Sequence, residues 1–297
     1  MNAISQLFLT ALEWLVTIIG DYGWSVVIFT LAFRILLIPL DYWQRKSMKK
    51  QQDIAPKVAA INAKYANDKD KANQKVMQLY KDEKVSVLSG CLPMLIQLPI
   101  FIFFFAAIRA MSENQLHAQY LQAAEAAAAG QNPASITITS FYWIKNLWQP
   151  DTFMASVIPS FSSLSKISIF ANVTDYDTVM APLMDLYANV KNGYAILPIL
   201  AGTTSILSSM VMNPQKRKKK TPQEILADKP EDQSAATGKM MQYFIPVISV
   251  IFCWTSSAAF ALYWVTSNLA SMVNTLVINW FLKRQEQRKA ELEVQSN

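Results

Sequence analysis

Cysteine, histidine and glycine are scarce in this chain, and their scarcity excludes several classes of site. The 297 residues include 2 cysteines, 1 histidine and 7 glycines. Cys91 and Cys253 both fall in apolar runs, where we interpret them as small buried hydrophobes. The single histidine is His117, and the sequence has no HExxH, no GxSxG and no Walker-type glycine loop. We therefore expect no catalytic residues, no metal site and no cofactor.

Charged residues are sparse in several long segments, which excludes an ordinary soluble protein. Hydrophobic residues make up 52% of the chain. A bilayer core needs about 20 apolar helical residues, and runs of this size occur at 22–43, 85–110 and 194–212. A fourth run, 240–282, is too long for one crossing and should reverse near Thr255, Ser256 and Ser257. The sequence predicts an all-α, polytopic membrane protein with five transmembrane helices.

Lysine and arginine are distributed unevenly among the connecting segments, and this distribution predicts the orientation. Residues 44–84 contain eleven basic residues, 213–239 contain seven and 283–297 contain four, whereas 111–193 contain three. The cytoplasmic side of a membrane protein is enriched in lysine and arginine. We therefore expect the N-terminus outside and the C-terminus inside, which agrees with an odd number of spans.

The first 21 residues are best interpreted as an amphipathic helix on the outer membrane surface. A sixth span and a secretory signal peptide are the alternatives, but no positive charge precedes the apolar part. Gly20 is expected to end the helix. The apolar residues that recur at helical spacing are Ile4, Leu7, Phe8, Ala11, Leu12, Leu15, Ile18 and Ile19.

Residues 44–84 are predicted to form a cytoplasmic helical hairpin. A break at Ala66, Asn67 and Asp68 separates two apolar stripes, and Pro56 is expected in a first helical turn. The charged faces either are merely solvated or contact a partner or lipid headgroups. The stripes are Ile54, Val58, Ile61 and Tyr65, then Ala72, Val76, Leu79 and Tyr80.

The remaining connections are a long outer segment and an inner basic loop. The outer segment begins with an alanine-rich helical piece, Leu116 to Ala129, followed by FYWIKNLW at 141–148, whose aromatic residues suit a membrane interface. The inner loop contains five consecutive basic residues, which either set topology or attract anionic lipid or ribosomal RNA. These residues are Lys216, Arg217, Lys218, Lys219 and Lys220.

These assignments divide the chain into ten consecutive parts. The predicted order is an outer amphipathic helix (1–21), a first span (22–43), the hairpin (44–84), a second span (85–110), the extracytoplasmic segment (111–193), a third span (194–212), a cytoplasmic loop (213–239), a fourth span (240–256), a fifth span (257–282) and a cytoplasmic tail (283–297).

Arg34 is the most informative residue, because it lies inside the apolar stretch WSVVIFTLAFRILLIPL. A cation at the centre of a membrane helix costs about 2.5 to 3.5 kcal/mol on insertion scales and usually faces protein or water. Arg34 lies nine residues before Trp43, so it is expected in the cytoplasmic half of the bilayer, where snorkelling to the headgroups is the alternative. Pro39 should loosen the backbone there.

Several spans also carry polar residues at helical spacing. Gln97 and Phe101 follow one line in the second span, Ser205 and Ser209 do so in the third, and Trp264 and Asn268 do so in the fifth. Such residues either join helices by hydrogen bonds or surround a hydrated cavity. The combination with Arg34 favours the cavity.

Five segments resemble the core of the YidC-type membrane protein insertases. They are TLAFRILLIPL, MQLYKDEKV, GCLPMLIQLPIF, YAILPILAG and FALYWVTSNL, and the resemblance covers 20–110 and 190–282 in the same order. The resemblance implies a five-helix core with a hydrophilic groove that is open to the cytoplasm and to lipid. About 40 residues between FYWIKNLW and the third span depart from the family pattern.

By position, the resemblance also implies site residues. Arg34 resembles the groove arginine that attracts the polar or acidic part of a substrate. The implied groove contacts are Thr30, Gln97, Trp264, Asn268 and Ser209, although many relatives have glutamine in place of Ser209. The apolar surface along which a substrate helix moves into lipid is implied to include Phe101, Ile251 and Trp254.

The implied partners are nascent membrane proteins, the ribosome, the Sec translocon and anionic lipids, with no small-molecule substrate. The implied location is the bacterial cytoplasmic membrane. The alternative function is a small-solute or ion transporter, which would usually show inverted repeats and intramembrane acids.

Overall fold

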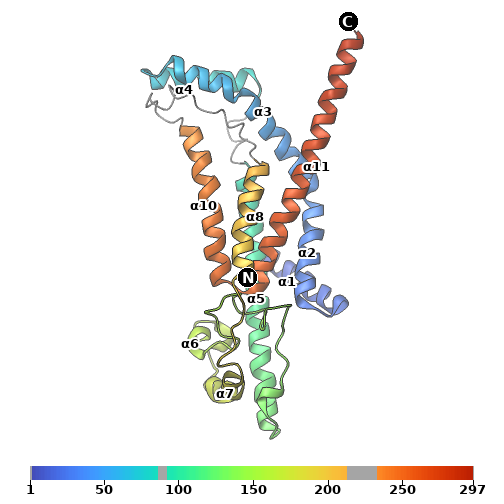
Figure 1. Cartoon of the computed structure of the whole chain (residues 1–297), viewed down its shortest axis with the longest axis vertical. Helices are drawn as coiled ribbons and strands as arrows, with labels where there is room; N and C mark the ends of the chain where they lie inside the picture. The colour runs from blue at the N-terminus through green and yellow to red at the C-terminus, as the bar shows by residue number, and fades with distance from the viewer. Residues whose placement is uncertain (1, 86–91, 213–232, 297) are drawn as a thin grey trace. The chain divides into compact units, whose positions relative to one another are not determined.

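A computed structural model of the chain describes residues 2–85, 92–212 and 233–296. Most of these residues are in helices, and nearly all of the others are in turns and irregular segments (Figure 1). Two isolated bridges, Phe141 with Ile144 and Ser156 with Lys191, are the β-type pairings within these ranges. The helices in chain order are α1 (Ala3–Ile19), α2 (Tyr22–Leu36), α3 (Ile38–Lys64), α4 (Lys69–Asp82), α5 (Leu92–Ala128), η2 (Pro133–Ser135), α6 (Phe161–Leu164), η3 (Ser168–Phe170), α7 (Tyr176–Leu186), α8 (Ile196–Met212), α10 (Gln233–Thr255) and α11 (Ala258–Ser296).

The chain divides into two compact units, and five helices contribute residues to both. The first unit contains Met1–Phe33, Ile100–Ile206 and Ile245–Leu269, and the second contains Arg34–Pro99, Leu207–Phe244 and Ala270–Asn297. The dividing points therefore fall within α2, α5, α8, α10 and α11.

In the first unit, α1 has the ends that its sequence predicts. The Asn2 side chain accepts a hydrogen bond from the Ser5 backbone N–H at 2.9 Å, and Gly20 ends the helix at φ 76°, a conformation that glycine adopts without strain. Leu9 and Leu12 are buried in the core of the unit, whereas the side chains of Ile4, Leu7 and Ile18 are 46%, 65% and 61% exposed. Only part of the predicted apolar face is therefore packed on protein.

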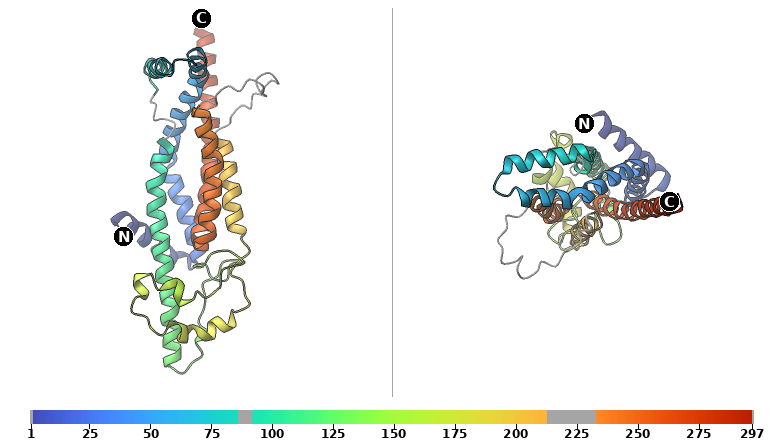
Figure 2. Two further views of the ribbon diagram at one scale, coloured as in Figure 1. Left: turned by 90° about the vertical axis from the view of Figure 1, so that its left-hand side faces the viewer. Right: turned by 90° about the horizontal axis from the view of Figure 1, so that it is seen from above.

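The outer segment folds against an extension of α5. The alanine-rich piece at 116–129 is continuous with the second predicted span, because the chain has no glycine or proline between Ile100 and Ala129. α6 and α7 lie beside the C-terminal half of α5 (Figures 1 and 2). The Tyr120 hydroxyl donates to Asp175 at 2.6 Å, and the rings of Tyr120 and Tyr176 stack with centroids 5.6 Å apart.

The residues around FYWIKNLW bind the N-terminal ends of two helices. The N–H groups of Ala258 and Ala259 at the start of α11 donate to the carbonyls of Gln149 and Leu147 at 2.9 and 3.0 Å. The Leu197 N–H in the first turn of α8 donates to the Asp151 carboxylate at 2.7 Å. Donors that a helix leaves unsatisfied at its N-terminus therefore have partners here.

The same segment is fixed by two buried asparagines. The Asn146 backbone N–H donates to the Asn192 side-chain oxygen at 2.7 Å, and the Asn192 side-chain amide donates to the Asn146 carbonyl at 3.0 Å. Asn192 also donates to the Pro150 carbonyl at 2.9 Å. The predicted interface segment is thus partly core: Ile144, Leu147 and Trp148 are buried, while Tyr142 is exposed.

In the second unit, α3 and α4 form an antiparallel pair and lie side by side when seen from above (Figure 2). The turn lies between Lys64 and Lys69, where the sequence predicts the break, and the Asp68 carboxylate caps α4 by accepting from the Lys71 N–H at 3.0 Å. Lys57 and Glu83 pair across the hairpin.

The expected position of Pro56 is wrong. α3 begins at Ile38 with Pro39 in its first turn, so Pro56 lies in the helix interior. Pro39 therefore occupies the position in the first turn where a missing N–H has no cost. Pro56 has no N–H, so α3 lacks one backbone hydrogen bond at this residue.

Length and apolar composition identify one stretch, Ala258–Arg288 within α11, that is able to cross a membrane by itself. Within the described parts of the chain, α2 and α3 would supply a second crossing if they are taken together across the break at Leu37. α1, α8 and the Phe244–Thr255 part of α10 are apolar but shorter. The five spans remain a prediction.

Candidate functional site

Arg34 lies in the last turn of α2, in the second unit, and is buried. Its side chain is 9% exposed, and the guanidinium Nη1 donates to the Gln97 side-chain oxygen of α5 at 3.4 Å. α2 ends at Leu36, because Pro39 has no N–H to donate to the Ile35 carbonyl one turn earlier and its ring clashes with that carbonyl. The structure therefore brings together two residues, 63 positions apart, that the sequence assigns to one site.

Asn274 of α11 completes this arrangement. Its side-chain amide donates to the Arg34 backbone carbonyl at 3.4 Å and to the Asp41 carboxylate at 3.3 Å. The carbonyl belongs to the last turn of a helix, where acceptors have no intrahelical partner. Asp41 is half-buried and interacts electrostatically with both Arg34 and Arg45.

Arg45 is a second buried arginine, with 7% of its side chain exposed. Its Nη1 donates to the Met212 carbonyl at the end of α8 at 2.7 Å, and its Nη2 donates to the Thr275 hydroxyl of α11 at 3.0 Å. A guanidinium presents its donors in a rigid fork, which allows Arg45 to connect α3 with two other helices.

Sequence reasoning missed Asp41 and Arg45 as members of the site. The sequence interpretation includes Asp41 in the first span without a role and assigns Arg45 to the charged hairpin. Their spacing of seven and eleven residues from Arg34 is close to whole numbers of helical turns, and this was the signal that could have found them. The result is a row of alternating charge: arginine, aspartate, arginine.

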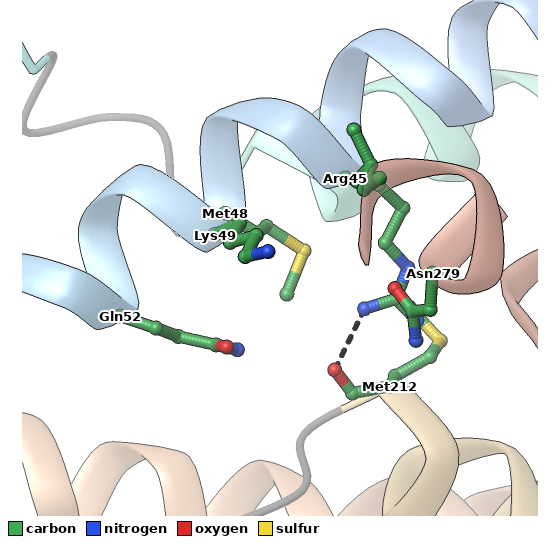
Figure 3. A pocket seen from close by; sticks show the side chains of 7 residues that line it. Arg45, Met48, Lys49, Gln52, Met212 and Asn279 are labelled. Carbon is green, nitrogen blue, oxygen red and sulfur yellow. Dashed lines mark hydrogen bonds between the residues drawn. The ribbon is translucent and has the colours of Figure 1, made fainter. Parts of the chain in front are cut away.

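A cavity of about 180 Å³ lies next to Arg45 (Figure 3). Figure 3 shows Gln52 of α3 and Asn279 of α11 at its sides and the hydrogen bond from Arg45 to Met212. The cavity is lined by Arg45, Met48, Lys49, Gln52, Met212, Asn279 and Leu282.

In the first unit, Trp264 and Asn268 belong to a different polar cluster. The Asn268 amide donates to the Ser205 hydroxyl at 2.9 Å, and the Trp264 indole donates to the same hydroxyl at 3.3 Å. Ser205 in turn donates to Ser249 of α10 at 3.1 Å. These are interhelical hydrogen bonds of the kind that join helices in lipid, so the substrate contact proposed for Trp264 and Asn268 stays a prediction.

The other predicted site residues have varied environments. Thr30 is buried, and its hydroxyl donates to the Val26 carbonyl at 2.7 Å. Ser209 is half-buried. Lys216, Arg217, Lys218, Lys219 and Lys220 lie outside the described residues.

Two residues of the predicted apolar surface pack against other aromatic rings, and the third is exposed. The Phe101 ring lies edge-on to Trp264 and to Phe252, with centroids 5.3 and 5.9 Å apart. The ring centroids of Trp254 and of Phe153 in the outer segment lie 5.6 Å apart, and Ile251 is exposed. The described residues contain no group of three or more His, Cys, Asp or Glu side chains that could hold a metal ion.

Comparison with known proteins gives a consistent result. A chain from Leptospira interrogans serogroup Icterohaemorrhagiae serovar Lai named membrane protein insertase YidC is 26% identical over 278 residues, which cover 92% of this chain and 33% of that protein. The protein of the same name from Campylobacter jejuni is 32% identical over 271 residues, covering 91% of this chain and 36% of that protein. This chain thus spans about a third of the length of these two relatives.

A third relative is closer in length. The membrane protein insertase YidC of Fusobacterium nucleatum is 27% identical over 260 residues, covering 88% of this chain and 87% of that protein. The resemblance inferred from the sequence motifs is confirmed. The family model described as "60Kd inner membrane protein" matches residues 14–286, and the chain therefore belongs to this family of inner membrane proteins.

Proposed function

We propose that this chain is a membrane protein insertase, which moves short hydrophilic segments of substrate proteins across the membrane and releases their apolar helices into it. The observation that carries the proposal is Arg34, a buried arginine in an apolar helix that is hydrogen-bonded to Gln97 of another predicted span. The names of the relatives support the same function.

We infer five spans from the same helices. α2 with the start of α3, the first half of α5, α8, α10 and the first half of α11 would cross the bilayer. The Lys and Arg distribution supports this inference, because it favours an outer N-terminus and an inner C-terminus and so an odd number of spans.

In the proposed mechanism, Arg34 attracts a carboxylate or polar group of the substrate to the inner half of the membrane. Each unsatisfied polar group in hydrocarbon costs several kcal/mol, so a polar site at this depth shortens the unfavourable path. A guanidinium and a carboxylate form paired, charge-assisted hydrogen bonds, which a neutral glutamine does not match. Thr30, Trp264, Asn268 and Ser209 are the other proposed groove contacts.

Release would follow from burial of the substrate helix in lipid. Transfer of apolar surface out of water contributes about 25 cal/mol per Å², so a substrate helix supplies the driving force without ATP. We propose that Phe101, Ile251 and Trp254 form the apolar surface beside which the helix moves. The exposure of Ile251 supports this role.

The partners in this proposal are nascent membrane proteins, the ribosome and anionic lipids. The chain would act either alone or together with the Sec translocon. The basic residues of 44–84 and 216–220 favour contacts with phosphate groups, because polybasic segments bind them electrostatically.

The experiment that tests the function is complementation of a bacterium depleted of its own insertase, combined with crosslinking. A photoreactive residue at Gln97 should trap ribosome-bound nascent membrane proteins during translation. A solute transporter would trap none. Failure both to restore growth and to crosslink nascent chains would refute the proposed function.

A further inference from the structure

The cavity beside Arg45 is bounded by cationic and amide groups with unused donors. Among the described residues, Arg45 uses two of its five N–H donors, on the Met212 carbonyl and the Thr275 hydroxyl. The side-chain amides of Gln52 and Asn279 have no hydrogen-bond partner in the described part of the chain, and both line the cavity. Lys49, also at the cavity, pairs with Glu286. An anion with several acceptor oxygens would satisfy these donors.

The residues next to the cavity indicate the depth at which it lies. Trp43, two residues before Arg45, is 55% exposed, and Trp280, next to Asn279, is 50% exposed. The Arg284 guanidinium stacks on the Trp280 ring at 4.1 Å. Exposed tryptophans beside basic residues are typical of the headgroup level of a membrane, so both helices that form the cavity pass that level at the cavity itself.

The apolar part of the lining and its surroundings indicate what kind of anion fits. Met48, Met212 and Leu282 are the apolar residues of the lining. Leu276, Val277 and Phe281 on α11 are exposed apolar side chains nearby in sequence. A ligand with a phosphate group and attached acyl chains matches both surfaces, whereas a free ion or a nucleic acid matches only the polar one.

We propose that this cavity binds the phosphate headgroup of an anionic phospholipid of the inner leaflet. Arg45 contacts the phosphate oxygens with its remaining N–H donors, and Asn279 and Gln52 donate to the phosphate or to the glycerol hydroxyls. The acyl chains lie along the exposed apolar face of α11. This site shares Arg45 with the row of charge that includes Arg34 and Asp41, but lipid binding there does not depend on the proposed insertase function.

The test uses the full chain in a neutral detergent, titrated with phosphatidylglycerol, with bound lipid counted by native mass spectrometry and stability followed by thermal melting. The wild type should bind phosphatidylglycerol more tightly than phosphatidylcholine. Arg45→Gln should weaken phosphatidylglycerol binding by about ten- to a hundredfold, the loss expected for charge-assisted hydrogen bonds. Lys46→Gln removes the same charge from an exposed position of α3 and should bind as the wild type does.

A second pair of variants separates binding from folding, because Arg45 also connects helices. Asn279→Phe fills the cavity from an exposed position and should weaken lipid binding without lowering the melting temperature in lipid-free detergent. Gln287→Phe adds the same ring at an exposed position of α11 outside the cavity lining and should leave binding unchanged. If Asn279→Phe binds phosphatidylglycerol as tightly as the wild type, the proposal is overturned, whatever Arg45→Gln does.

Two competing ligands complete the test. Inorganic phosphate at millimolar concentration should not displace the lipid, because it lacks the acyl chains. Tighter binding of a short RNA than of phosphatidylglycerol, with the same dependence on Arg45 and Asn279, would also overturn the proposal.

Discussion

Replacing Asp151 by alanine should release the N-terminal end of α8. The carboxylate is fully buried and accepts three hydrogen bonds, from the Leu197 N–H at 2.7 Å, the Tyr194 N–H at 2.9 Å and the Trp143 indole at 3.3 Å. It also lies at the N-terminus of α8, where the helix dipole favours a negative charge. Alanine removes all of these interactions and leaves the buried Leu197 N–H without an acceptor.

The magnitude follows from the bonds. The buried N–H left unsatisfied costs about 1 to 3 kcal/mol, the other two hydrogen bonds contribute about 0.5 to 1.5 kcal/mol each, and the charge at the helix terminus contributes about 0.3 to 1 kcal/mol. Asp151→Ala should therefore lower local stability by about 2 to 7 kcal/mol. Asp151→Asn keeps one acceptor oxygen and should cost about 1 to 3 kcal/mol.

Hydrogen exchange measured by mass spectrometry on the peptide covering residues 193–199 reports this local stability directly. Exchange in Asp151→Ala should be at least about thirtyfold faster than in the wild type. Gly193→Ala should act in the same way, since a Cβ there would lie 1.9 Å from an Asp151 carboxylate oxygen. Asp185→Ala, an exposed aspartate of α7, is the control. Exchange within about threefold of wild type in Asp151→Ala would refute the assigned role.

Four further outcomes are expected. Arg34→Lys should retain insertion of substrates with acidic outer segments in a depletion strain and Arg34→Ala should not, and equal growth of both would count against the proposed role of the charge. Asp41→Asn removes an anion that offsets Arg34, so purified protein in vesicles should insert acidic substrates at least as fast as wild type; slower insertion would contradict this reasoning. Ser205→Ala should lower thermal stability by about 1 kcal/mol, since interhelical hydrogen bonds in lipid average about 0.6 kcal/mol each, and an unchanged melting temperature would argue against the cluster. The hydrogen bond to Asp175, with burial, raises the pKa of Tyr120 to about 12 from 10.0; its contribution to stability should be complete below pH 10 and be lost as the pH rises through about 12, and Asp175→Asn should move tyrosinate absorbance to lower pH.

Local signals explain which parts of the fold could be predicted. Gly20 ends α1, α10 ends at Thr255 and α11 begins at Ala258, where the sequence predicts a reversal, and the hairpin turns where the apolar stripes are interrupted. Each signal acts within one or two helical turns of the residues it affects, so a single sequence contains it.

The outer segment could not be predicted because its stabilising contacts are long-range. Asn146 and Asn192 are 46 positions apart, and Tyr120 and Asp175 are 55 positions apart. No periodicity connects such residues, and the serine-rich segment between 152 and 170 contains only short helices. Its buried core, which includes Phe170, Tyr176 and Leu183, forms only when α7 packs against the extension of α5.

The two buried arginines differ in the side-chain hydrogen bonds that they donate to other helices. Arg45 donates at 2.7 and 3.0 Å to a backbone carbonyl and a hydroxyl, which are normal hydrogen-bond lengths, so moving it would cost two good bonds. The bond from Arg34 to Gln97 is longer, at 3.4 Å, and has a neutral acceptor. A substrate carboxylate would therefore replace this contact with a stronger, charge-assisted one. In the proposed mechanism, Arg34 therefore exchanges its Gln97 contact for a substrate group, whereas Arg45 keeps its two hydrogen bonds.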